Sequence, residues 1–175
     1  MKTRILAISG SLRTGSLNTA MLEAAAQLAP DRVEVELYRE IGALPPFTPD
    51  LDDAIPERVR AFRALAAAAD ALLIACPEYA GGMPGMFKNA LDWLVGCPDF
   101  NSRPVVLINV SPRAVEAESA LRLVLKTMSA PVVEPASRRI PVRDRLATAE
   151  SLGADPEIRA ALEDMFGALA LFLEA

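Results

Sequence analysis

Apolar and polar residues along the chain form short apolar runs separated by longer stretches with helical spacing. Nearly continuous apolar runs are typical of strands buried on both faces, and they predict strands at 4–9, 71–77 and 104–112. The alternating stretch "VEVEL" at 33–37 predicts a further strand. A weaker strand is predicted within 131–142, interrupted at Pro135 because proline cannot donate a ladder hydrogen bond.

Apolar residues at helical spacing predict helices between and after these strands, covering 17–28, 57–69, 85–96, 114–129 and 155–174. The last of them, for example, places Ile158, Leu162 and Met165 on one stripe. An alanine cluster at 64–71 is assigned to a helix. The Pro- and Asp-rich stretch 38–56 is assigned to a long loop, a kind of segment that often carries function.

The order of these elements predicts the fold. Strands that alternate with helices imply βαβ units, and therefore a parallel sheet covered by helices on both faces. Five strands and five helices suit an α/β protein with a flavodoxin-like three-layer sandwich, a five-stranded parallel sheet of order 2-1-3-4-5. No repeat or linker interrupts the 175 residues, so we expect a single domain over 1–175.

Composition then narrows the chemistry. A formal net charge of −5 argues against a nucleic-acid partner, which would require a basic surface. The chain has no histidine, which removes Ser-His-Asp and Cys-His catalysis and disfavours a catalytic metal site. No apolar run approaches the ~20 residues of a membrane helix, and the first residues lack the pattern of a signal peptide. We therefore expect a cytoplasmic protein with no membrane partner.

Two loops contain unusual sets of small and polar residues. "GSLRTGSLNTAML" at 10–22 follows the first strand and packs glycines, hydroxyls and an arginine into the start of a helix. This composition suits either a plain helix cap or an anion held at the helix N-terminus. "CPEYAGGMPGMFKNALDWL" at 76–94 follows the third strand, and its glycines would let the backbone approach a flat ligand. Both loops are expected at the carboxyl edge of the sheet, where ligands bind in such folds.

Taken together, the motifs "GSLRTGSLNTAML" and "PEYAGGMPGMFKNALDWL" resemble the two signatures of the NAD(P)H-dependent FMN reductases, which include quinone and chromate reductases. The resemblance implies a bound FMN, with NADPH or NADH as hydride donor and a small-molecule electron acceptor such as a flavin or quinone. It implies FMN phosphate contacts from Ser11, Arg13, Ser16, Leu17 and Asn18. It assigns the lining of the isoalloxazine ring to Pro77, Glu78, Tyr79, Ala80, Gly81 and Gly82, and the ring's other edge to Ser111, Pro112 and Arg113.

The resemblance departs from the family pattern at two places. Ala80 stands where the family usually has asparagine, and the third loop reads "SPRAVEAES" where many members are rich in glycine. Two other functions stay open at this point, a flavodoxin-type electron carrier that does not oxidise NAD(P)H and a flavin-free interaction module. In the reductase the flavin would carry the chemistry, and the two substrates would take turns over one ring face, giving ping-pong kinetics.

Several residues near these motifs have competing interpretations. Glu78 is interpreted as an acceptor of backbone N–H bonds rather than as a proton donor, and Cys76 as a core residue rather than a redox thiol. Trp93 is assigned to packing. Arginine clusters at 138–139 and 143–145 are interpreted as a solvated basic rim, with attraction of the hydride donor's phosphates as the alternative.

The helix at 85–96 also bears on assembly. Its apolar residues surround half of its circumference or more, which exceeds the stripe needed to pack on one sheet. We therefore expect a homodimer or homotetramer in which a neighbouring subunit covers the excess. The alternative is that the loop at 38–56 or the last helix covers it within one chain.

Overall fold

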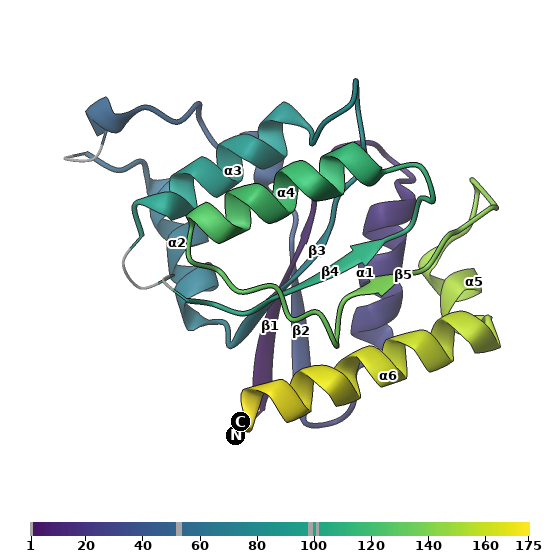
Figure 1. Cartoon of the computed structure of the whole chain (residues 1–175). Coiled ribbons are helices and arrows are strands. Elements are labelled where there is room, and N and C mark those ends of the chain that lie inside the picture. Colours follow the sequence, from purple (N-terminus) through teal and green to yellow (C-terminus); the bar gives the residue numbers. More distant parts are fainter. Residues whose placement is uncertain (1, 52–53, 98–99, 101) are drawn as a thin grey trace.

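The computed structural model describes residues 2–51, 54–97, 100 and 102–175 (Figure 1). Within these residues, five strands form one parallel sheet of order β2-β1-β3-β4-β5, as the sequence predicts. The strands are β1 (Thr3–Ser9), β2 (Val33–Tyr38), β3 (Ala71–Ala75), β4 (Val105–Asn109) and β5 (Arg138–Arg139).

Helices cover both faces of the sheet. The helices are α1 (Leu17–Gln27), α2 (Glu57–Ala68), α3 (Gly85–Val95), α4 (Val115–Thr127), α5 (Ala149–Ala154) and α6 (Pro156–Leu173), with 3-10 turns at Ile41–Ala43 and Pro49–Leu51. Helices α2, α3 and α4 pack with Leu6 and Ile8 on one face, and α1, α5 and α6 pack with Ile5 and Ala7 on the other (Figure 1). This alternation of neighbouring strand residues between two cores produces the three-layer sandwich.

The fifth strand is short and interrupted. Val132 forms an isolated bridge with Val105, and pairing with β4 resumes only at Arg138 and Arg139. The expected interruption at Pro135 is confirmed, because the chain turns away from the sheet at 134–136.

The structure differs from the predicted elements at one boundary and by one additional helix. The alanine cluster at 64–71 is not all helix, since α2 ends at Ala68 and Ala71 begins β3. Alanine fits both elements, and the break comes where the Asp70 carboxylate accepts the backbone N–H of Arg4 at 2.8 Å. Helix α5 was not predicted either. It is only six residues long and is capped by Thr148, whose side chain accepts the backbone N–H of Ser151.

The loop at 38–56 covers the outer side of α3. Trp93 is fully buried, and its indole N–H donates to the carbonyl of Pro45 at 2.8 Å. The Asn89 side chain donates to the same carbonyl and accepts the backbone N–H of Phe47 at 2.7 Å. The rings of Phe47 and Trp93 pack in a T-shaped arrangement with their centroids 5.0 Å apart. The packing interpretation of Trp93 is therefore confirmed.

This coverage corrects the argument for a second subunit at α3. The wide apolar surface of the helix is buried mostly by its own chain, through Pro45 and Phe47, as the alternative interpretation held. Residues 52–53 of the loop lie outside the described residues. The apolar arc of α3 thus no longer indicates a homodimer.

Asn89→Ala tests the attachment of the loop to α3. The substitution removes both side-chain bonds to the loop and leaves the Phe47 N–H without its acceptor. We expect the free energy of unfolding in urea to fall by about 1–3 kcal/mol. Lys88→Ala, which loses only a partly exposed ion pair with Asp92, should change it by about 0.5 kcal/mol or less. Equal losses in the two variants would contradict this account of the loop.

Candidate active site

The carboxyl ends of β1, β3 and β4 border a cavity of about 840 Å³, a volume typical of small-molecule sites. Most of the residues predicted for the site line it, namely Ser11, Arg13, Ser16, Leu17, Asn18, Pro77, Glu78, Tyr79, Ser111, Pro112 and Arg113. Ala80, Gly81 and Gly82 do not line it. Sequence reasoning missed the lining residues Val110, Ala114, Pro141 and Val142, and it assigned Arg143 and Arg145 to a basic rim.

The start of α1 offers unused polar groups to this cavity. Ser16 occupies the N-cap position, but its hydroxyl makes no capping hydrogen bond. The Asn18 side chain is only 7% exposed, and within the described part of the chain its Oδ1 has no hydrogen-bond partner. Free backbone N–H groups at a helix start, together with a free hydroxyl, suit a phosphate. An orphaned buried carbonyl suits a ligand hydroxyl group.

The first two loops meet at the side chains of Ser11 and Tyr79. The Ser11 hydroxyl lies 3.3 Å from the Tyr79 hydroxyl and also accepts the backbone N–H of Arg13. Tyr79 is 51% exposed, so its ring is available to a ligand in the cavity. This contact places the polar loop after β1 beside the glycine-rich loop after β3.

A tight hairpin forms the tip of the second loop. Tyr79 and Gly82 exchange two backbone hydrogen bonds of 2.9 and 3.1 Å. The two residues between them have positive φ angles, +51° at Ala80 and +74° at Gly81, as a type I′ turn requires. Glycine adopts this conformation freely, whereas alanine is strained in it. The departure at Ala80 therefore carries a conformational cost, because asparagine tolerates such angles better.

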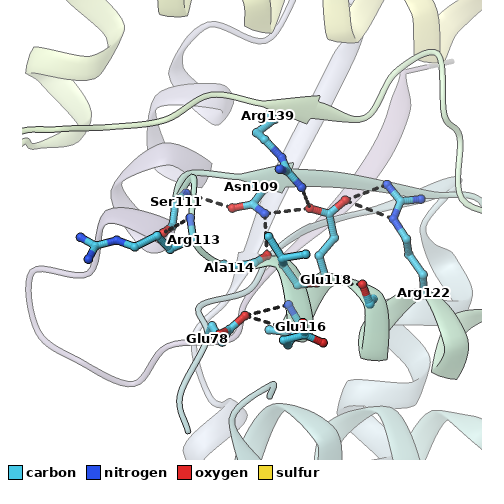
Figure 2. Close-up of polar contacts among 12 residues, drawn as sticks. Glu78, Asn109, Ser111, Arg113, Ala114, Glu116, Glu118, Arg122 and Arg139 are labelled. Carbon is cyan, nitrogen blue, oxygen red and sulfur yellow. Dashed lines mark hydrogen bonds and ion pairs between the residues drawn. The ribbon is translucent and has the colours of Figure 1, made fainter. Parts of the chain in front are cut away.

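Glu78 connects the second loop to α4 (Figure 2). Its Oε2 accepts the backbone N–H groups of Glu116 and Ala117, at 2.9 and 3.0 Å, in the first turn of that helix. These N–H groups have no acceptor within the helix, so the carboxylate satisfies two donors that would otherwise be orphaned. The interpretation of Glu78 as a structural acceptor is confirmed.

Asn109 holds the third loop in place (Figure 2). Its side chain accepts the backbone N–H of Ser111 and donates to the carbonyl of Ala114, both at 2.9 Å. Asn109 is 7% exposed and ends an otherwise apolar strand. A polar residue in that place was the signal in the sequence, but only the structure shows which loop it holds.

Other candidates prove to be structural. Burial raises the pKa of the Cys76 thiol to about 12, so this residue stays a neutral thiol in the core. Arg138 and Arg139 are engaged in ion pairs with Asp164 and Glu118. A second cavity, of about 620 Å³, lies on the β2 side of the first loop and shares Ser11, Arg13, Ser16 and Arg145 with the first cavity. Among the described residues, no helix combines the length and the apolar character needed to cross a membrane.

Two proteins of similar sequence are named as reductases. The chain is 40% identical to a 2-hydroxy-1,4-benzoquinone reductase from Burkholderia sp over 128 residues, covering 70% of this chain and 69% of the relative. It is 40% identical over 111 residues to an NAD(P)H-dependent FMN reductase from Pseudomonas aeruginosa, covering 62% of this chain and 60% of the relative.

Solved structures share the fold. The flavoenzyme FerB from Paracoccus denitrificans, an NAD(P)H:(acceptor) oxidoreductase, matches with a TM-score of 0.74 and 24% identity over 97% of this chain and 98% of that one.

The family model described as NADPH-dependent FMN reductase matches residues 3–141. The chain therefore belongs to the NADPH-dependent FMN reductase family and is an NAD(P)H-dependent flavin oxidoreductase.

Proposed function

We propose that this chain binds FMN in the 840 Å³ cavity and transfers two electrons from NAD(P)H to a quinone or a similar small acceptor. One observation carries the proposal: the cavity is lined by two chemically different sets of residues. Unused hydroxyl and N–H groups line it at the start of α1, and a half-exposed tyrosine and two prolines line it at the loops after β3 and β4. A phosphate with a planar head group matches this asymmetry.

The residues present fit FMN. Ser11, Arg13 and Ser16 would hold its phosphate with the N–H groups of α1, and the orphaned carbonyl of Asn18 would accept a ribityl hydroxyl. Residues 77–79 and 111–113 would border the ring, with the hairpin at 80–82 beyond them. When bound, FMN supplies the hydride-accepting chemistry that a protein without histidine lacks.

The chain itself supplies binding, orientation and charge stabilisation. The hairpin uses the N–H groups of Tyr79 and Gly82 for its own bonds, and those of Ala80 and Gly81 would donate only to a ligand ring that extends past the cavity lining to the hairpin tip. Such donors favour negative charge on a reduced ring, as an oxyanion hole does. The positive charges of Arg13, Arg113, Arg143 and Arg145 around the cavity act in the same direction and would also attract the anionic hydride donor.

The acceptor is proposed to be a quinone because the Burkholderia relative and several others are named quinone reductases. The alignment with the Pseudomonas aeruginosa relative spans 60% of that protein's length, so we do not assign the full activity of that relative to this chain. Membership in a reductase family favours this function over the electron carrier that the sequence left open.

The homodimer or homotetramer expected from the sequence stays a prediction, as does the location in the cytoplasm. Two exposed side chains on the helices α3 and α4, Val95 and Leu123, are available to a second copy of the chain.

Steady-state kinetics test the proposed reaction. If NAD(P)H and quinone use one ring face in turn, double-reciprocal plots at several quinone concentrations will give parallel lines. Intersecting lines would mean that both substrates bind together and would contradict the shared face. A protein that binds FMN but does not oxidise NADPH or NADH would overturn the reductase function itself.

Arg13→Ala tests the phosphate end of the cavity. Loss of a charge-assisted hydrogen bond should weaken FMN binding by about 1.5–3 kcal/mol, measured by flavin fluorescence in titrations of the apoprotein. Arg32→Ala is the matched control, because Arg32 lies just before β2 at the opposite edge of the sheet. Unchanged affinity in the Arg13 variant would place the phosphate elsewhere.

Glu78→Gln separates structural from catalytic use of this side chain. Glutamine keeps an oxygen that can accept the two N–H bonds from α4, but it cannot deliver a proton as an acid. We expect kcat to stay within about threefold, whereas removal of a general acid typically costs about a hundredfold or more. Glu78→Ala, which loses the acceptor, should lower the free energy of unfolding by about 1–2 kcal/mol. A large loss of kcat in the glutamine variant, with unchanged stability, would identify Glu78 as a proton donor.

A further inference from the structure

The carboxylate of Glu118, near the start of α4, is a junction of hydrogen bonds (Figure 2). Its Oε2 accepts from Asn109 Nδ2 at 2.7 Å and from Arg139 Nη2 at 2.8 Å. Its Oε1 accepts from Arg122 Nε and Nη2, at 3.1 and 3.0 Å. The side chain is only 19% exposed. An ionised carboxylate has the acceptor capacity for all these donors, so the junction is saturated.

Each partner on the Oε2 side leads to a different wall of the cavity. Asn109 bonds to both ends of the third loop, at Ser111 and Ala114. Arg139 belongs to β5 and directly precedes a segment that lines the cavity with Pro141, Val142, Arg143 and Arg145. The loop after β4 and the segment after β5 are therefore joined through one carboxylate.

The same turn of α4 also holds the wall formed by the second loop. Glu78 accepts the N–H groups of Glu116 and Ala117, the residues that precede Glu118 in the helix. Three segments that border the cavity thus depend on the first turn of α4. A shift of this turn would move all three together.

The charge state of Glu118 favours a permanent junction. Partial burial alone would raise its pKa, but hydrogen bonds from Asn109, Arg139 and Arg122 outweigh this effect and lower it below the ordinary value. The carboxylate is therefore ionised at neutral pH. Charge-assisted bonds of this kind are short and strong, which suits a fixed position.

We propose that Glu118 is a positioning residue for the flavin site, which sets the spacing of the third-loop and post-β5 walls without itself touching the ligand. Glu118 and Arg139 are not among the residues that line the cavity. Their effect on FMN must therefore act through Asn109 and the neighbouring segments. The inference rests on the proposed FMN site.

Two adjacent arginines give a matched test. Arg139→Met removes the bond to Glu118, whereas Arg138→Met removes an ion pair with Asp164 and hydrogen bonds to the carbonyls of Pro135 and Ser137, none of which involves Glu118. In titrations of the apoprotein with FMN, we expect the Arg139 variant to raise Kd by about fivefold or more, as coupled neighbours do. The Arg138 variant should leave Kd within about twofold, the scale of uncoupled sites. The absorption bands of the bound flavin should shift only in the Arg139 variant, because a changed ring environment alters them and a general loss of stability does not.

Variants of Glu118 itself complete the test. Glu118→Gln keeps an oxygen toward Asn109 and Arg139 and should bind FMN more tightly than Glu118→Ala, which loses the junction. Equal Kd values for the Arg139 variant and the unaltered protein would overturn the positioning role. So would equal weakening by the Arg138 and Arg139 variants, or by the two Glu118 variants. If the unaltered protein fails to bind FMN, the proposed function fails first, and the two failures are thereby distinguished.

Discussion

The parallel pairing of β1 with both β2 and β3 is the constraint on which the rest of the structure depends. The sheet grows from β1 toward β2 on one side and toward β3 on the other. The loops that follow β1 and β3 start at the same edge of the sheet but run in opposite directions, so a gap opens between them. That gap is the cavity bordered by Ser11, Tyr79 and Ser111. The two apolar cores hold the sheet in place, and the ends of its strands determine where the loops begin.

Loops at such an edge are held largely by polar contacts, several of them partly buried. Glu78 accepts two backbone N–H groups at the start of α4, Asn109 donates to the carbonyl of Ala114, and Glu118 accepts from the side chain of Asn109. A buried network of this kind is rigid when all its members are satisfied, and leaving one partner unsatisfied is costly. In contrast, Asn18 lines the cavity, and its buried Oδ1 has no hydrogen-bond partner among the residues that the structure describes. The satisfied groups hold the site, and the unsatisfied group is the one a ligand would use.

Much of this arrangement could be predicted from the sequence. Continuous apolar runs define β1, β3 and β4, and their alternation with helices leads to the observed strand order. The residue composition of the loops at 10–18 and 77–82 indicates which chemical groups these loops contribute to the site. Contacts between distant residues could not be predicted. From the sequence, the wide apolar arc around Trp93 predicts a subunit surface, because the sequence does not show that Pro45 and Phe47 pack onto this arc. Likewise, nothing in the local pattern pairs Glu118 with Asn109 and Arg139.

The central claim is that the cavity binds a mononucleotide flavin whose single phosphate lies at the start of α1. Its most direct test is to reconstitute the purified protein with a mixture of FMN and FAD, remove the unbound flavin, and identify the bound flavin by chromatography after denaturation. The account predicts FMN, bound at one molecule per chain and with little FAD. Preferential retention of FAD, or no retained flavin at all, would contradict it.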